Sequence, residues 1–184
     1  MPTNPTCASG CAPAGLPTVS FDDCQPEINH SEVEELFIAK TSAIDFTDWT
    51  SPTEWATRLS QSSTSTGNEI RRLTVIGDKP AAQPEKKVIS KKRTIKLDAT
   101  HTLNCEIDDT NNTNYTAMRS WQCSGNKAKI WYKTRGGKLF GGNSGITADT
   151  EFWDILARGD EHEKITAVFN WFSKFDPERC TSPI

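Results

Sequence analysis

The sequence predicts a mainly β fold: an antiparallel β-barrel or sandwich with one flanking α-helix, a second short helix and an extended N-terminal arm. Three observations support this prediction. Apolar and polar residues alternate over 94–107, a helical spacing follows at 115–121, and further strand patterns begin at residue 127. Alternation places one side-chain face on a core and the other in water, as in antiparallel sheets.

The folded part is expected to begin near Val33. A short apolar strand at 36–39 comes first, and residues 44–46 are expected to resume it after a polar turn. Residues 51–54 read Ser-Pro-Thr-Glu, which is a capping box with proline at the first helical position. The second short helix should therefore run from there to about Leu59.

A long loop over 77–93 follows a predicted strand at 70–76, because Pro80 and Pro84 cannot continue a sheet. A cluster of basic residues follows within eight residues of this loop: Lys86, Lys87, Lys91, Lys92 and Arg93. The loop must project into solvent or onto a partner. One interpretation is a solvated hairpin arm whose lysines discourage edge-to-edge aggregation. The other is an arm that docks on an acidic surface of a neighbouring subunit. Nucleic-acid binding is less favoured, because no aromatic side chains lie between the lysines to stack on bases.

In the alternating run, Leu103, Cys105 and Ile107 share the face assigned to the core, and His101 is assigned to the polar face. A polar break over 109–112 ends this strand. The spacing then places three large side chains on one side of the flanking helix, which needs a sheet to lie on: Tyr115, Met118 and Trp121.

Beyond the helix, a strand at 127–132 and a hairpin turn at 136–137 lead into a strand at 138–140. The glycine-rich residues 141–145 lack the spacing of a nucleophile elbow and the lysine of a phosphate-binding loop. They are expected to form a flexible turn or bulge.

Two long strands, at 146–156 and 164–172, are predicted to close the chain. The second has four apolar residues on one face, while Val168 and Phe172 add apolar surface to the other. A strand that is apolar on both faces should be buried on both. Either the flanking helix or another subunit must then cover the face with Val168 and Phe172.

Composition indicates one soluble domain over 32–184 and an arm over 1–31, since 35% of the 184 residues are hydrophobic and 24% are charged. The net charge of −3 gives no general attraction to nucleic acid. No apolar run approaches the roughly 20 residues of a membrane span. The N-terminus lacks a basic start and an apolar h-region, so we expect neither signal-peptide export nor a membrane anchor.

The six cysteines do not form one framework. In a reducing compartment they are expected to be free thiols, with Cys105 and Cys123 as small apolar core residues. The alternative is a zinc site, because sulfur and imidazole ligands suit a tetrahedral metal. Its candidate ligands are Cys7, Cys11, Cys24 and His30. A disulfide between Cys180 and the leader is a further possibility.

The sequence contains no recognisable catalytic or cofactor-binding arrangement. The three histidines lie in unrelated segments, and the acidic pairs 108–109 and 160–161 lack the alternating oxygen ligands of an EF-hand. We therefore expect no enzymatic activity and no cofactor.

The order of elements resembles the tube proteins of bacteriophage tails and their relatives. The resemblance covers about residues 33–175 and rests on element order, on Asn-Tyr-Thr-Ala-Met-Arg at 114–119, on Lys-Ile-Trp-Tyr at 129–132 and on Gly141-Gly142. It implies a barrel or sandwich that assembles into stacked homo-oligomeric rings, with a hexamer as the candidate stoichiometry. In that case 77–93 is the inter-ring loop, and the leader reaches an adjacent subunit. The cysteine-containing leader and the helix at 51–59 depart from the simplest members of the family.

The sequence thus favours a non-enzymatic structural subunit of a virion, assembled in the host cytoplasm, whose rings form a conduit for the genome without sequence-specific DNA binding or membrane contact. Tryptophan content, the arm and the two-sided final strand support subunit contact. The candidate interface residues are Lys86, Lys87, Lys91, Lys92, Arg93, Val168 and Phe172. The alternatives are a neck or capsid-associated virion protein with other virion proteins as partners, a metal-binding adaptor and a surface-binding module.

Overall fold

The computed structural model describes residues 24–25, 28–62, 67–82, 86–90, 93–123, 127–154 and 163–184. The strands are β1 (Val33–Ala39), β2 (Ile70–Asp78), β3 (Lys86–Ser90), β4 (Arg93–Lys96), β5 (Ala99–Ile107), β6 (Lys127–Thr134), β7 (Lys138–Phe140), β8 (Ile146–Asp154), β9 (Ile165–Ser173) and β10 (Arg179–Thr181). The helices are α1 (Pro52–Ser60) and α2 (Asn112–Cys123).

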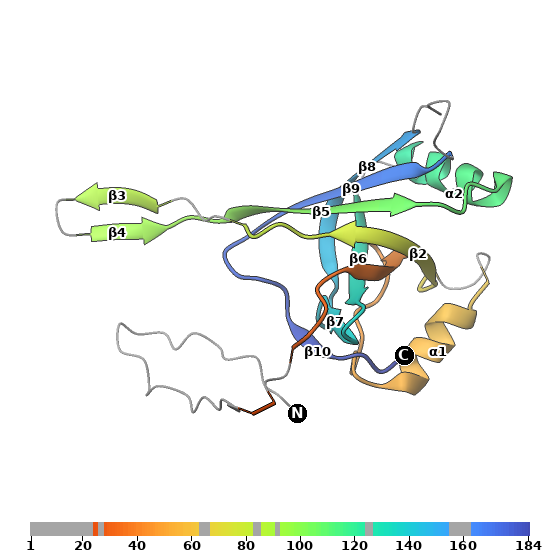
Figure 1. Cartoon of the computed structure of the whole chain (residues 1–184), viewed down its shortest axis with the longest axis horizontal. Coiled ribbons are helices and arrows are strands. Elements are labelled where there is room, and N and C mark those ends of the chain that lie inside the picture. Colours follow the sequence, from red (N-terminus) through yellow and green to blue (C-terminus); the bar gives the residue numbers. More distant parts are fainter. Residues whose placement is uncertain are drawn as a thin grey trace.

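The predicted fold class is confirmed, because the protein is mainly β and six of its strands close into an antiparallel barrel (Figure 1). Their order is β1-β2-β5-β9-β8-β6, and β6 pairs with β1 to close the sheet. Strands β7 and β10 extend the sheet beyond β6, and β3 and β4 form a separate hairpin.

The barrel lumen is filled by side chains that alternate along each strand. In β9, the predicted core face of Ile165, Ala167, Phe169 and Trp171 is buried. The assignment of His101 to the polar face is wrong, since the residue is only 3% exposed and its ring stacks on that of Trp171. His101 lies two positions before Leu103 and four before Cys105, so the two-residue period of a strand places all three on the inner face.

The strand that is buried on both faces is β1, whereas the sequence pointed to β9. Inside the barrel, Leu36 and Ile38 join the main core. Outside it, Phe37 packs in a second cluster with Trp55 of α1 and Trp131 of β6. In β9, by contrast, Val168 is half-buried and Phe172 is 71% exposed, so α2 does not cover that face.

Helix α2 lies across one end of the barrel and contacts β8. The three large side chains predicted for one helix face point to the barrel core: Met118 is buried, and Tyr115 and Trp121 pack against the same cluster. The helix begins where the side chain of Asn111 accepts hydrogen bonds from the backbone N–H groups of Thr113 and Asn114, both at 2.9 Å.

Other predicted boundaries change where tertiary contacts replace strand pairing. Residues 44–46 do not form a strand, because their backbone N–H groups bond to loops: that of Ile44 to the Asn68 side chain and that of Phe46 to the Asn143 carbonyl. The alternating run over 94–107 breaks at Leu97 and Asp98 into β4 and β5. The C-terminal residues form β10, which the sequence did not predict, by pairing with β7.

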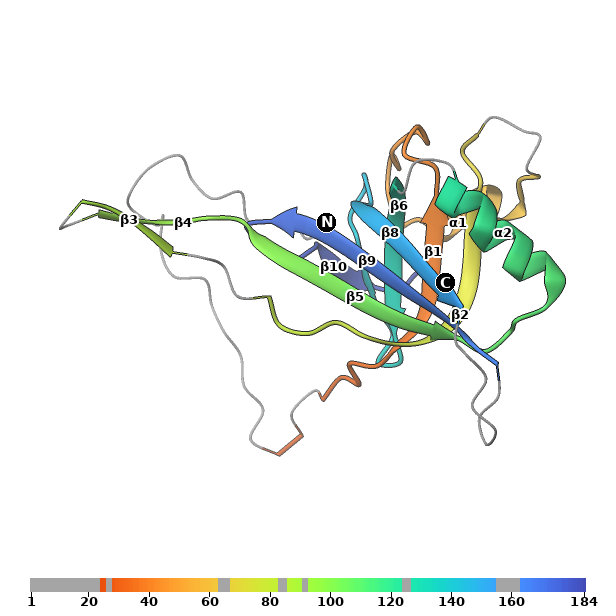
Figure 2. The same cartoon turned by 90° about the horizontal axis from the view of Figure 1, so that it is seen from above.

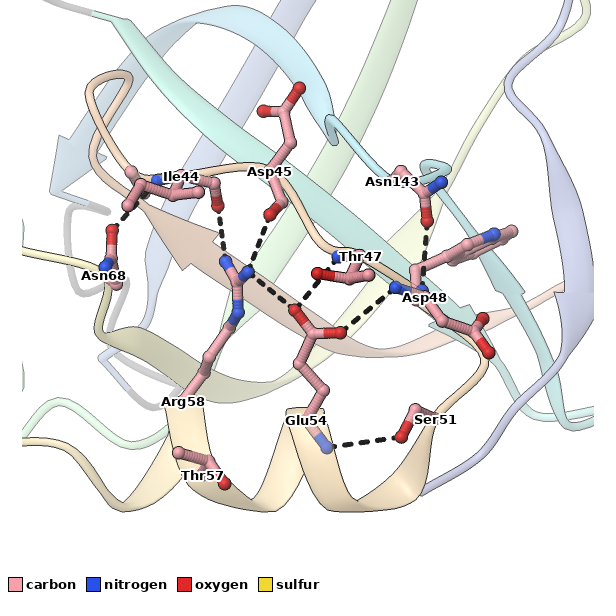
Figure 3. Close-up of polar contacts among 12 residues, drawn as sticks. Ile44, Asp45, Thr47, Asp48, Ser51, Glu54, Thr57, Arg58, Asn68 and Asn143 are labelled. Atoms are coloured by element: carbon pink, nitrogen blue, oxygen red, sulfur yellow. Dashed lines mark hydrogen bonds and ion pairs between the residues drawn. The ribbon is translucent and has the colours of Figure 1, made fainter.

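Helix α1 is held against the barrel by a polar cluster around Glu54 and Arg58 (Figure 3). The Glu54 carboxylate accepts hydrogen bonds from the backbone N–H groups of Thr47 and Asp48, each at 3.1 Å. Its ion pair with Arg58 measures 2.8 Å, and the guanidinium also donates to the Ile44 and Asp45 carbonyls at 2.5 and 2.8 Å. One half of the expected capping box is present, since the Ser51 hydroxyl accepts a hydrogen bond from the backbone N–H of Glu54 at 3.5 Å. The Glu54 carboxylate, expected to reach back to Ser51, ties the helix to the preceding loop.

The glycine-rich residues 141–145 form the predicted turn, and it packs against Trp131. The indole N–H of Trp131 donates to the Gly142 carbonyl at 2.8 Å. Gly145 has a φ of +67°, and a Cβ there would lie 2.6 Å from Cζ2 of Trp131. Further hydrogen bonds tie this turn to Phe46, Trp49 and Glu178.

Replacing Gly145 by alanine should destabilise the protein by two effects, the positive φ and the clash with Trp131. The first costs about 1–2 kcal/mol and overpacking costs a further ~1–3 kcal/mol. Gly137→Ala is the matched control, since Gly137 has a φ of +73° but open space around a Cβ. Urea unfolding should show Gly145→Ala clearly less stable than Gly137→Ala. Equal losses would mean that Trp131 does not restrict the turn.

Glu54→Gln should lower the free energy of unfolding by about 2 kcal/mol at pH 7, because one amide oxygen cannot replace a charged acceptor of several bonds. Burial raises the pKa of Glu54, but the bonds from Asp48, Thr47 and Arg58 outweigh it and hold that pKa below 4.5. A depressed folded pKa means that the stabilisation is present above the unfolded pKa and is lost as pH falls through the folded value. Denaturation of both proteins at pH 7 and pH 3 should therefore show the difference shrinking with acid.

The control for that measurement is Glu34→Gln. The Glu34 side chain is 41% exposed, and its 3.7 Å pair with Lys133 should contribute only about 0–1 kcal/mol. A Glu54→Gln loss no larger than this control would contradict the role assigned to the cluster.

Candidate assembly surface

The β3–β4 hairpin projects from the barrel as an arm, as the basic loop was expected to do (Figure 1). It pairs with no other strand, and all five residues of β3 are exposed. A two-stranded hairpin without a packed face is marginally stable on its own. The β-branched Val88 and Ile89 are 67% and 56% exposed, so the arm offers apolar surface as well as charge.

The basic residues predicted for this arm are only partly described. Lys86, Lys87 and Arg93 lie on the hairpin and are exposed. Lys91 and Lys92 lie outside the described residues. The described basic residues therefore occupy the expected place, on a segment that has strand edges open to pairing.

Exposed apolar side chains gather at the end of the barrel from which the hairpin emerges. Of the seven large exposed apolar residues in the described part of the chain, Val88 and Ile89 are on the hairpin, and Phe172 and Phe175 are at its root. Phe172 is opposite Thr100, the second residue of β5. Such a concentration marks an interaction surface more often than isolated exposed residues do.

At the root of the hairpin, polar contacts join the barrel to the end of β9 and the segment after it. Imidazole Nε2 of His101 lies 3.1 Å from the carbonyl oxygen of Ser173, and Nδ1 lies 3.7 Å from the Asp176 carboxylate. Lys79, the residue directly after β2, donates a hydrogen bond to the same carboxylate at 2.9 Å. Asp176 thus contacts both chain segments that lead to the hairpin, the one after β2 and the one at the start of β5.

The opposite end of the barrel carries the acidic turn predicted as a docking partner. Asp108 and Asp109 are exposed and lie between β5 and α2, while the hairpin precedes β5 at its other end (Figure 2). The second acidic turn, residues 160–161, lies outside the described residues. The basic hairpin and this acidic turn thus lie beyond opposite ends of β5.

Two of the four candidate zinc ligands lie in the described part of the chain. Cys7 and Cys11 lie outside the described residues, and Cys24 and His30 are exposed. Within the described ranges, no three His, Cys, Asp or Glu side chains come together as a metal-binding group. Cys105 and Cys180 are free thiols, as expected; the side chain of Cys123 is not among those described.

Two of these thiols are poor nucleophiles in their surroundings. Burial, with a smaller effect of Asp78, raises the pKa of Cys105 to about 12. Burial and Asp48 raise the pKa of Cys180 to about 11, and the side chain packs against the outer cluster. Both remain protonated at neutral pH, which fits packing and not thiolate chemistry.

Sequence reasoning named Phe172 as a candidate interface residue but missed the other exposed apolar residues of this surface. Val88 and Ile89 were read only as part of a basic loop, and Phe175 was not considered. The two adjacent β-branched residues in Lys-Lys-Val-Ile-Ser at 86–90 were the available signal for a strand.

None of the helices in the described part of the chain has the length and apolar character needed to cross a bilayer. Comparisons of the chain with family models, curated proteins and solved structures found no match.

Proposed function

We propose that the protein is a structural subunit that assembles with copies of itself into the stacked rings of a phage tail tube, with a neck or capsid-associated virion role as the alternative. The observation that carries the proposal is the exposed β3–β4 hairpin with the apolar side chains at its root. Val88 and Ile89 on the hairpin, and Phe172 and Phe175 at its root, are apolar side chains that a solitary subunit leaves in water.

The distribution of charge supports a head-to-tail contact. The hairpin brings Lys86, Lys87 and Arg93 to one end, and Asp108 and Asp109 are at the other. Two different surfaces that complement each other make a heterologous interface, which closes into a ring or continues as a filament. In this proposal, the hairpin of one subunit docks on the acidic turn of the next and so stacks the rings.

A conduit for the genome, in this proposal, is enclosed by a ring of subunits. The lumen of one barrel is filled by side chains such as Leu103, Phe169 and Ile130, all fully buried. A single subunit therefore offers no passage, and the exposed lysines need not contact DNA bases.

Removing the apolar surface of the hairpin should weaken assembly without unfolding the barrel. The double variant Val88→Thr, Ile89→Thr keeps the β-branched shape and strand preference but loses apolar area. The control is Ile76→Thr, which alters an apolar residue that is 53% exposed on the barrel. Sedimentation velocity and electron microscopy should show fewer rings or tubes for the hairpin variant alone. A wild-type chain that stays monomeric at all concentrations would contradict the proposal.

Reversing charge on the hairpin should weaken association and flatten its dependence on salt. In Lys86→Glu, Lys87→Glu, attraction to acidic turns becomes repulsion, while Lys86→Arg, Lys87→Arg keeps the charge as the control. Exposed pairs contribute roughly 0–1 kcal/mol each, and the screening length at 0.15 M salt is only ~8 Å. Light scattering across salt concentrations checks the association, and the thermal midpoint should stay nearly unchanged. An unaltered salt response would return the hairpin to the role of a solvated arm.

A further inference from the structure

A groove at the α2 end of the barrel has the features of a docking site between copies of this chain, an inference that rests on the self-assembly proposed above. The groove has a volume of about 430 Å³ and lies between α2 and the ends of β1, β2, β6 and β8. Its volume falls in the range of roughly 300–1,000 Å³ typical of ligand sites. The groove exists because α2 contacts the barrel through β8 and leaves the side of β1 and β2 uncovered.

The floor of the groove is the open end of the hydrophobic core. Ile38, Met118 and Phe152 line it from three different elements, together with the half-buried Leu73 and Trp121. All five belong to the main core cluster or pack against it. An occupant with apolar side chains would extend that core.

The rim of the groove is mostly cationic. Lys40, Arg71, Arg72 and Lys127 line it against a single acidic residue, Glu69. Arg72 pairs with Glu35, and Lys127 lies 3.7 Å from Asp149. Arg71 donates to a neutral acceptor, the Gln61 carbonyl, and Lys40 is 65% exposed. The rim therefore favours an occupant that carries negative charge.

The buried carboxylate of Glu69 favours an occupant that can donate a hydrogen bond. Glu69 is 7% exposed, one oxygen lies 3.6 Å from Nζ of Lys40, and the buried Oε2 has no hydrogen-bond partner within the described structure. A buried acceptor without a donor is costly, and a hydroxyl or backbone N–H of an occupant would satisfy it.

The leader contains one segment with all three properties. Residues 16–23 read Leu-Pro-Thr-Val-Ser-Phe-Asp-Asp, which combines three large apolar side chains, two hydroxyls and two adjacent carboxylates. Residues 1–15 contain no charged side chain, and the whole leader 1–31 contains no Lys or Arg. We propose that residues 16–23 of one copy bind the groove of a second copy, with the apolar side chains on the floor and Asp22 and Asp23 at the cationic rim.

The path of the chain favours a contact between copies over one within a copy. The backbone N–H of Gly136 donates to the His30 carbonyl at 3.2 Å, which holds the end of the leader at the hairpin end of the barrel. β1 then runs to the groove end, and its seven residues span about 23 Å. A head-to-tail neighbour would present its groove at the end where the leader departs.

The test uses a labelled peptide of residues 12–23 and the full-length chain. The acceptor carries Leu16→Ser and Phe21→Ser, so that its own leader does not compete. Fluorescence anisotropy should saturate with this acceptor, and adding Ala117→Glu should weaken peptide binding about tenfold or more, because a carboxylate then fills the groove. Thr116→Glu is the matched control, since Thr116 is its exposed neighbour on α2 and does not line the groove. A peptide with Asp22→Asn and Asp23→Asn should bind more weakly and with less salt dependence.

Sedimentation velocity then distinguishes the copies. Leu16→Ser with Phe21→Ser, or Ala117→Glu alone, should each weaken association of the full-length chain, and Thr116→Glu should not. Peptide binding without any loss of association would place the leader in its own groove and overturn the proposed contact. Absence of saturable peptide binding would overturn the site itself. Hairpin variants that lose association but still bind the peptide would show that the two contacts are separate.

Discussion

The rest of the structure depends on strand β1, which closes the barrel and is buried on both faces. It pairs with β2 along one edge and with β6 along the other. Its inner side chains fill the lumen, and its outer side chains are buried only where a second element packs on them. Helix α1 supplies that cover through Trp55, and the bonds of Glu54 and Arg58 hold the helix in place.

Because β1 is covered on both faces, the surfaces proposed to bind other copies lie at the two ends of the barrel. One end carries the hairpin, its exposed apolar root and the departure of the leader. The other carries the acidic turn and the groove with a cationic rim. The two ends differ in shape, and the contact proposed between them is head-to-tail, the kind of contact that builds rings or filaments.

Local patterns identified most elements because their physical causes are local. Period-two alternation identified β5 and β9, and the change to helical spacing identified α2. The capping box located α1 to within a residue or two, since its first turn satisfies its own backbone groups. The basic residues of the candidate surface were equally visible, because charge on a segment broken by proline seldom enters a core.

The sequence by itself determined the fold class, the basic arm and the inner face of β9. Only the tertiary structure decided which strand is buried twice, because that depends on where α1 packs, some 15 residues farther along the chain than the strand it covers. It also decided that His101 faces the lumen beside Trp171 and that residues 44–46 bond to loops. The groove was beyond reach for the same reason: its walls come from four strands and a helix, and only packing brings such distant segments together.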